Sequence, residues 1–261
     1  MASPAHPYYP RELELAGLQL LVVDFPYVLG TFAVFVTVVL SSVWLYSGRR
    51  AHLSTLERLL ACWFALTGLI HLVVEGYVVL KSDFIHDQSG MLKTYLSDVW
   101  KEYSKADSRY ITRDAFIVSM EAVTAFAWGP ASMAVVCGVL RRAPWRYGLM
   151  LIVSVGQIYG DVLYFATCFF EGLKHTRPEL MYFWGYFLGA NGIWIVVPGL
   201  VALHALRQMS RAVAGADAGE REQTQRDEKT EGEKQKARDG NGVYSLRAKA
   251  TATADGKDKA L

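Results

Sequence analysis

The sequence contains few of the residues that soluble enzymes use for metal, redox or disulfide chemistry. Its 261 residues include three cysteines and six histidines, and only 20% of them are charged. Cys62, Cys137 and Cys168 stand far apart inside apolar runs. This spacing excludes a C-x-x-C motif and a disulfide framework, and we interpret all three cysteines as small buried hydrophobic residues.

Other absences narrow the function further. The formal net charge is +2 without a basic stripe, which argues against nucleic-acid binding. The six histidines are scattered, so we expect no metal site. There is no lysine inside the long apolar runs, no G-x-S-x-G, no H-E-x-x-H and no glycine-rich phosphate loop. These absences exclude a retinal Schiff base and the common hydrolase, zinc-protease and nucleotide-binding motifs.

What the sequence does contain is a series of long apolar runs. A membrane-spanning helix needs about 20 mostly apolar residues, and five runs meet this length: about Tyr27 to Tyr46, Leu59 to Leu80, Ala115 to Leu140, Tyr147 to Phe170 and Met181 to Leu206. Their length favours helices over buried strands. The sequence therefore predicts an all-α, polytopic membrane protein with a bundle of five transmembrane helices.

The remaining segments predict the organisation and orientation of the chain. Residues 1–26 read as an N-terminal interfacial segment, residues 27–206 as the transmembrane domain, and residues 207–261 as a disordered charged tail. Arginines cluster in the loops after the first and third spans, at Arg49, Arg50, Arg58, Arg141, Arg142 and Arg146. The positive-inside rule places these loops and the tail in the cytosol and the N-terminus in the lumen. The final residues also match a K-x-K-x-x retrieval signal for the endoplasmic reticulum.

Ionisable residues inside the spans are the candidates for function, because a charge in hydrocarbon is costly unless it is paired or faces a cavity. Thr67, His71 and Glu75 recur every four residues, which places them on one face of the second helix. A desolvated carboxyl beside an imidazole can serve as a proton donor near neutral pH. A purely structural His-Glu pair is the alternative.

Three other spans carry similar polar and aromatic stripes. They comprise Glu121, Thr124 and Trp128 in the third span, Gln157, Asp161 and Tyr164 in the fourth, and Asn191, Trp194 and Pro198 in the fifth. Together they suggest one pocket with acids on one wall and aromatic faces on another, a combination that favours a cation. Gln157 and Asp161, with Thr67, are interpreted as supporting residues behind the pocket, and Asp161 alone could equally be a structural hydrogen-bonding group.

Several long blocks, in order along the chain, resemble the emopamil-binding protein family, the sterol Δ8-Δ7 isomerases. The resemblance covers about residues 6 to 203 and rests on HPYYPRELEL, CWFALTGLIHLVVEGY, WKEYSKADSRY, MEAVTAFAWGPAS, SVGQIYGDVLYF and YFWGYFLGANGIWIVVPG. It implies a five-helix enzyme of the endoplasmic reticulum that moves a sterol double bond from C8=C9 to C7=C8 without a cofactor. The tail is longer and richer in alternating charges than the family pattern.

The resemblance also implies roles for individual residues. Its acid-base residues correspond to His71, Glu75 and Glu121, and its pocket residues to Tyr110, Thr124, Asn191 and Trp194. The implied partners are a sterol substrate, membrane lipid and cationic amphiphilic amines as inhibitors, and a homodimer is a further expected assembly. We expect the His71-Glu75 pair to deliver a proton and Glu121 to stabilise the cation and accept a proton, although these two roles could be exchanged.

Two other functions remain open at this point. A non-catalytic sterol or cationic-amine binding protein would use the same pocket without turning over its ligand. A proton-coupled transporter would also place Glu and His inside the membrane, but the five spans show no inverted repeat.

Overall fold

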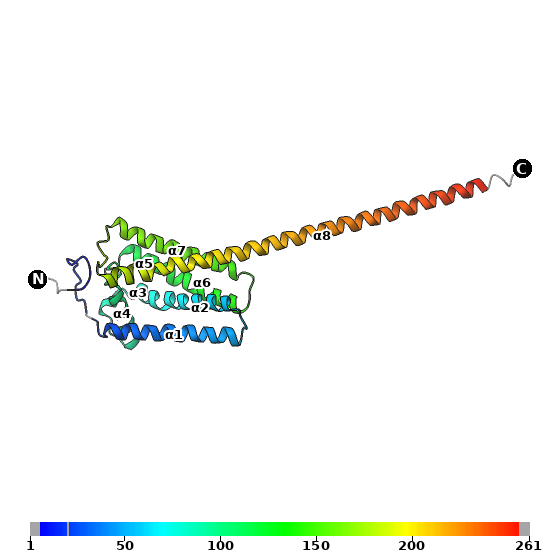
Figure 1. The fold of residues 1–261 in the computed structure, drawn as a ribbon. Helices are drawn as coiled ribbons and strands as arrows, with labels where there is room; N and C mark the ends of the chain where they lie inside the picture. The colour runs from blue at the N-terminus through cyan, green and yellow to red at the C-terminus, as the bar shows by residue number, and fades with distance from the viewer. Residues whose placement is uncertain (1–5, 20, 256–261) are drawn as a thin grey trace. The chain divides into compact units, whose positions relative to one another are not determined.

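The computed structural model describes residues 6–19 and 21–255, with side chains up to Lys236. Within these residues, five helices are long and apolar enough to cross a membrane. The spans are Phe25–Arg49, Thr55–Leu80, Ala115–Leu140, Arg146–Phe170 and Met181–Lys236, and Figure 1 shows them in chain order. The predicted all-α membrane bundle is thereby confirmed.

Three of the spans change helix type part-way. The second span consists of α2 (Thr55–Leu69), the π-helix η1 (Ile70–Glu75) and α3 (Gly76–Leu80). The third consists of α5 (Ala115–Val123), the π-helix η3 (Thr124–Trp128) and α6 (Gly129–Leu140). The fifth begins with the π-helix η4 (Met181–Ala190) and continues as α8 (Asn191–Asp255). The first and fourth spans, α1 (Phe25–Arg49) and α7 (Arg146–Phe170), are uninterrupted α-helices.

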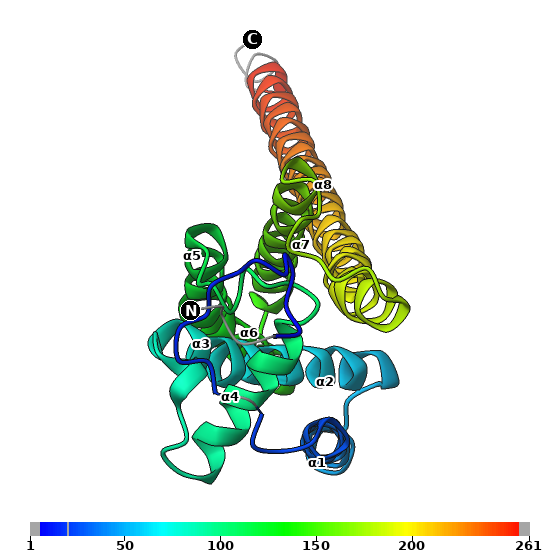
Figure 2. The same cartoon turned by 90° about the vertical axis from the view of Figure 1, so that its left-hand side faces the viewer.

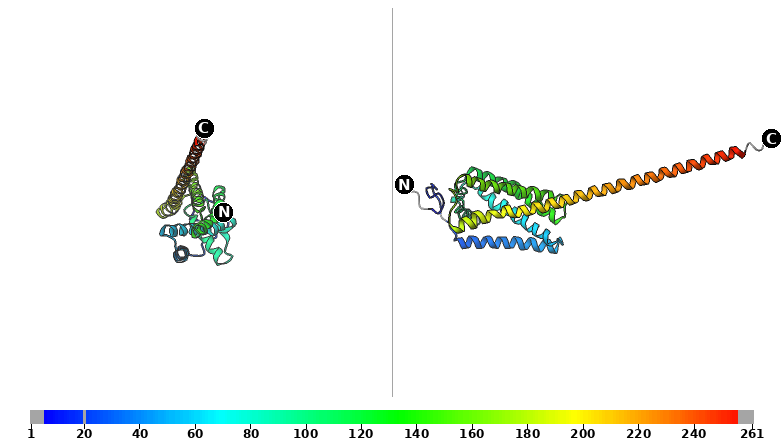
Figure 3. Two further views of the ribbon diagram at one scale, coloured as in Figure 1. Left: turned by 90° about the vertical axis from the view of Figure 1, so that its right-hand side faces the viewer. Right: turned by 45° about the horizontal axis from the view of Figure 1, so that its top comes forward.

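The helix ends follow local sequence signals. Ser54 caps α2 in a reciprocal capping box with Glu57, which satisfies backbone N–H groups that a helix start leaves free. Arg58 on the same helix donates to the carbonyl of Trp44 over 2.9 Å and lies over its indole ring. These contacts join α2 to the end of α1, and the two helices pack against each other at one edge of the bundle (Figure 3).

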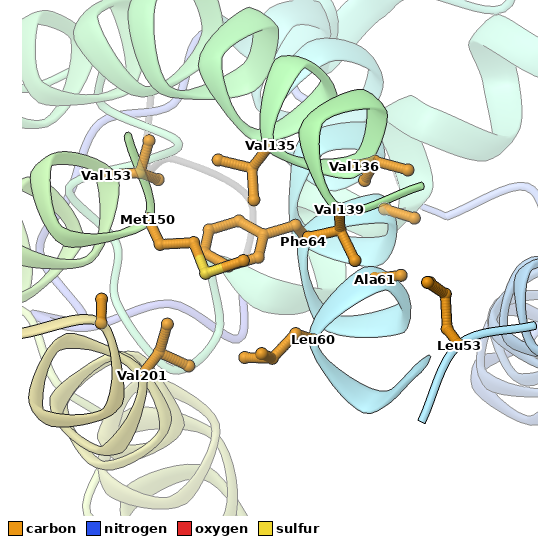
Figure 4. Close-up of a cluster of buried hydrophobic side chains, with 12 residues drawn as sticks. Leu53, Leu60, Ala61, Phe64, Val135, Val136, Val139, Met150, Val153 and Val201 are labelled. Atoms are coloured by element: carbon orange, nitrogen blue, oxygen red, sulfur yellow. The ribbon is translucent and has the colours of Figure 1, made fainter. Parts of the chain in front are cut away.

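The main apolar core fills the space between four of the helices. Figure 4 shows side chains from α2, α6, α7 and α8 meeting in one cluster, with Phe64 near its centre. In α2 and α6 the core residues recur at helical spacing, as Leu60 and Phe64 and as Val135 and Val139 do. The apolar periodicity of the spans therefore becomes a packed interior, while α1 remains mostly exposed, as expected for a helix that faces lipid.

A shorter helix lies outside the spans, between the second and the third. The 3-10 turn η2 (Phe84–His86) leads to α4 (Met91–Tyr103), which contacts α1 and α3 at one end of the bundle (Figure 2). Its residues Asp98 and Lys101 form a fully buried ion pair of 3.3 Å. Asp98 also accepts hydrogen bonds from the backbone of Val22 and Val23, which anchors the start of α1 to this helix.

The chain divides into two compact units, Met1–Arg207 and Gln208–Leu261. The sequence predicts a disordered tail from residue 207, whereas the structure continues α8 as a helix to Asp255. This segment has no proline and is rich in Ala, Glu, Lys, Gln and Arg, the residues with the highest helix propensity. Every side chain from Met209 to Lys236 is exposed. The K-x-K-x-x pattern at residues 257–261 lies outside the described residues.

Candidate active site

The centre of the site is a His-Glu pair in the second span. His71 Nδ1 lies 2.6 Å from Glu75 Oε2, and both residues are buried. The other ring nitrogen, Nε2, lies 3.1 Å from the Gln157 amide nitrogen on α7. Both nitrogens of the imidazole are therefore engaged by protein groups.

The second acid comes from the third span. Glu121 is buried near the end of α5, and each of its carboxylate oxygens accepts a hydrogen bond from a hydroxyl. Tyr110 donates to Oε1 over 2.7 Å, and Thr124 donates to Oε2 over 3.0 Å. Tyr110 precedes the third span. Burial raises the pKa of its hydroxyl well above the usual value, and the charge of Glu121 raises it further. Tyr110 is thus held as a neutral hydrogen-bond donor.

The two acids meet because η1 and η3 pack against each other. The Glu75 carboxyl lies beside the Glu121 carboxyl and the Thr124 hydroxyl. π-helical turns occur frequently at functional sites in helical proteins, where the extra residue in the turn redirects side chains. Glu75 is the last residue of η1, and Glu121 lies three residues before η3. The site therefore lies where the regular α-helical pattern is interrupted.

Aromatic rings line the cavity beside these polar groups. The Trp194 indole lies 5.1 Å from the His71 ring, centroid to centroid, and 5.7 Å from the ring of Trp63. Tyr110 stacks on Trp100 at 4.8 Å. A cation placed between the acids and these rings would be attracted from both sides.

Asn191 occupies the start of α8 and contacts no carboxyl group. Its side-chain oxygen accepts a hydrogen bond of 2.9 Å from Tyr103, and its amide nitrogen donates to the backbone oxygen of Phe187 over 2.8 Å. These contacts join α8 to η4 and to α4. Asn191 therefore holds this side of the site in place.

These groups surround a cavity of about 500 Å³. The residues predicted to form or support the site all line it: Thr67, His71, Glu75, Tyr110, Glu121, Thr124, Gln157, Asp161, Asn191 and Trp194. Most of the other lining side chains are apolar or aromatic. Gln157 and Thr67, interpreted as supporting residues, are thus part of the wall itself.

Sequence reasoning missed several lining residues, and two residues of the predicted stripes, Trp128 and Pro198, are not part of the lining. Trp100, Glu102 and Tyr103 of α4 line the cavity, and the spacing of Leu96, Trp100 and Tyr103 at i, i+4 and i+7 is the signal that could have revealed this face. Trp128 does not line the cavity. It packs over Gly156, where an added Cβ atom would meet its ring at 2.3 Å.

The cysteines also differ in part from expectation. Cys62 and Cys168 are buried as predicted, but Cys137 is exposed. It lies within a membrane span, on α6. The sequence alone does not distinguish an apolar run that faces lipid from one that faces a protein core. The prediction that Cys137 is buried was therefore wrong.

Comparison with known proteins agrees with this architecture. Residues 95–205 match the family described as EXPERA (EXPanded EBP superfamily). The chain is 44% identical over 220 residues to a rat protein named 3-beta-hydroxysteroid-Delta(8),Delta(7)-isomerase, an alignment that covers 82% of this chain and 93% of the relative. The chain belongs to the EBP family.

Relatives in the EBP family come from animals and plants. The mouse protein of the same name is 42% identical, with 82% of this chain and 93% of the relative covered. A protein of Arabidopsis thaliana named as the probable enzyme is 37% identical, with 83% and 95% covered. The EBP family match includes Glu121, α7 and the start of α8, whereas His71 and Glu75 lie before the matched residues.

Proposed function

We propose that the chain is a sterol Δ8-Δ7 isomerase, which moves the ring B double bond from C8=C9 to C7=C8. The observation that carries this proposal is the meeting of Glu75, Glu121 and His71, from two separate spans, in one largely apolar cavity. A cavity of about 500 Å³ is in the range of small-molecule sites. The names of the animal and plant relatives support the same reaction.

The reaction needs a proton donor and a proton acceptor beside the same ring. The Glu75-His71 pair protonates C9, and the electrons of the C8=C9 bond form the new C9–H bond, which leaves a tertiary cation at C8. Glu121 then removes a proton from C7, and the electrons of that C–H bond form C7=C8. One proton is gained and one is lost without a change in oxidation state, so the step requires no redox cofactor.

The hydrogen bonds around the acids support this division of roles. Glu121 accepts hydrogen bonds from Tyr110 and Thr124, which orient both of its carboxyl oxygens. In the proposed mechanism Glu121 is the group that stabilises the cation and accepts the proton. Glu75 instead shares a short contact with His71, through which a proton can be resupplied.

The surroundings protect the cation and admit the substrate. The Trp194 ring face contributes on the order of 1 to 2 kcal/mol to a desolvated cation. Leu29 of α1 and Ile193 of α8 line the cavity and are also exposed within membrane spans. We therefore expect the sterol to enter from the bilayer, so that the reacting atoms meet lipid and apolar side chains instead of water.

The proposed mechanism and the sequence also suggest which inhibitors bind the protein, how it is oriented in the membrane and which partners it has. Cationic amphiphilic amines would mimic the C8 cation and act as inhibitors. The arginine-rich loops place the N-terminus in the lumen and α8 toward the cytosol, and the family resemblance implies the endoplasmic reticulum membrane. Membrane lipid and a second copy of the chain are the further proposed partners. Protease protection of tagged N- and C-termini in microsomes tests the orientation.

A non-catalytic sterol or amine binding protein is the alternative. To separate the two, the purified full chain is incubated with a Δ8 sterol, and the products are analysed by gas chromatography and mass spectrometry. We expect conversion to the Δ7 isomer, which should fall by roughly 100-fold or more in Glu121→Gln, because positioned acid-base groups contribute about that much. Recovery of unchanged Δ8 sterol from a protein that binds it would support the binding protein instead.

A further inference from the structure

One face of α7 carries polar groups without partners. Among the described residues, Gln157 Oε1, Asp161 Oδ2 and the Tyr164 hydroxyl are buried and have no hydrogen-bond partner. All three residues line the cavity, and they follow one another at i, i+4 and i+7 on one helix face. Buried polar groups without partners cost free energy, so a ligand that supplies a partner here would bind more tightly.

Several other polar groups of the cavity already have a protein partner. His71, Glu75, Glu121, Thr124 and Asn191 each have a protein partner in the structure. Gln157 also has one, since its amide nitrogen contacts His71. Among the described residues, the buried groups of the cavity without a partner are Trp63 Nε1, Gln157 Oε1, Asp161 Oδ2 and the Tyr164 hydroxyl. Asp161 and Tyr164 are the two that place an acceptor and a hydroxyl donor next to each other on one helix face.

The position of Tyr164 is held by the protein behind it. The guanidinium of Arg109 lies over the Tyr164 ring, 4.9 Å from its centroid, and donates to the Tyr164 backbone oxygen over 3.3 Å. Arg109 is in turn held by Asp107 at 2.8 Å and by Thr167 at 2.7 Å. The ring is thus fixed while its hydroxyl is left unsatisfied, an arrangement expected of a binding group.

A sterol carries one polar group that matches this pair. Its 3β-hydroxyl donates one hydrogen bond and accepts another, and it lies on ring A, adjacent to the ring that reacts. Asp161 is one helical turn, roughly 5.4 Å, from Gln157, which contacts the His71-Glu75 pair. Asp161 therefore lies further along the cavity wall than the group that contacts the His71-Glu75 pair, as a group that binds the neighbouring ring must.

We propose that Asp161 and Tyr164 form the subsite for the sterol 3β-hydroxyl, with Asp161 accepting its proton and Tyr164 donating to its oxygen. This inference rests on the proposed isomerase function. The subsite sets the position of ring B against Glu75 and Glu121, and it gives the otherwise apolar cavity its selectivity for a hydroxylated steroid. Asp161 and Tyr164 are therefore substrate-positioning residues that take no part in the proton transfers.

The test compares a Δ8 sterol with its 3-deoxy analogue in wild type and Asp161→Ala. In wild type, kcat/KM should be about 10-fold higher for the hydroxylated sterol, the discrimination expected from one good hydrogen-bonded group. In Asp161→Ala this ratio should fall to about 1. A ratio that stays unchanged while both substrates react more slowly would overturn the inference, as would a wild type that does not discriminate.

Further variants and a binding measurement separate a loss of hydroxyl recognition from a loss of folding or of turnover. Asp161→Leu keeps a side chain of similar size without a hydrogen-bond acceptor, and it substitutes for Asp161→Ala if that variant does not fold. Tyr164→Phe should lower the same ratio, whereas Tyr159→Phe, at an exposed position of α7, should leave it unchanged. The binding of both sterols is measured in parallel. Absence of turnover by wild type would contradict the isomerase function, while the ratio of the two affinities would still decide whether Asp161 recognises the hydroxyl.

Discussion

At the scale of single residues, the chemistry depends on how the protein holds two carboxyl groups that lie side by side. Glu121 is held by two hydroxyl donors, whereas Glu75 is held by an imidazole whose other nitrogen contacts Gln157. The environments differ although both residues are glutamate. In the proposed mechanism, this difference permits one acid to give a proton and the other to receive one.

Removal of a single donor to Glu121 tests this view. In Tyr110→Phe the ring keeps its stacking on Trp100, but the hydrogen bond to Glu121 is lost. Because a hydrogen bond to a charged group contributes about 1.5–3 kcal/mol, we expect kcat to fall roughly 10-fold or more with little change in thermal stability.

A second tyrosine supplies the control. The Tyr77 hydroxyl donates to Asp87 and to the backbone of Lys93, and Tyr77 does not line the cavity. Tyr77→Phe should therefore leave kcat within about twofold, the size of an ordinary surface effect. Equal losses of kcat in the two variants would show that the Tyr110 hydroxyl has no particular role in the site.

Helical spacing was sufficient to predict some of these residues and not others. His71 and Glu75 were predicted to share a face, and they are in contact. Trp100 and Tyr103 could not be placed in the same way, because they lie outside the spans and reach the cavity only through the packing of α4. The roles of all the site residues remain predictions.

At the scale of helices, the site lies at the two packed π-helical segments. The positions of the five spans follow from the length of their apolar runs, and their helical class is confirmed. The π-helical turns do not follow from composition, because apolar runs of similar composition form uninterrupted α-helices in the first and fourth spans. They depend on which side chains meet across η1 and η3, a property of the packed bundle.

Gly129 offers a way to perturb that packing without touching an acid. It begins α6 directly after η3, and a Cβ atom added there would lie 2.9 Å from Leu72 Cγ and 3.3 Å from His71 Cβ. Gly129→Ala should push η1 outward, lower stability by about 1–3 kcal/mol and reduce activity. Thermal unfolding and kcat measure the two effects.

The matched control is Gly199→Ala, in α8. An added Cβ atom at Gly199 meets nothing within 4 Å, so this variant should keep its activity and gain slightly in helix propensity. If Gly129→Ala is as active and as stable as Gly199→Ala, the close contact between η1 and α6 is unimportant for the site.

At the scale of the whole molecule, the site belongs entirely to the first of the two units. All residues that line the cavity lie between Phe25 and Trp194, and the first unit ends at Arg207. The alternating charges of the second unit predict disorder, which stays a prediction, and the structure draws residues 208–255 as a continuation of α8. Charge alternation excludes a packed core, but it does not exclude an exposed helix stabilised by pairs at i and i+4.

Truncation after Arg207 tests this division. Because every described side chain from Met209 onward is exposed and none lines the cavity, kcat/KM of the shortened chain should remain within about twofold of the full chain, as for surface changes. Activity in detergent is the measurement. A loss of turnover by a truncated protein that still folds would show that the second unit contributes to the site.

Isotope labelling tests the central claim most directly. If an exchangeable carboxyl proton is delivered to the sterol, turnover of a Δ8 sterol in deuterated water should place one deuteron at C9 of the Δ7 product, detectable by mass spectrometry and NMR. A Δ7 product formed in deuterated water without deuterium at C9 would contradict protonation by the His71-Glu75 pair.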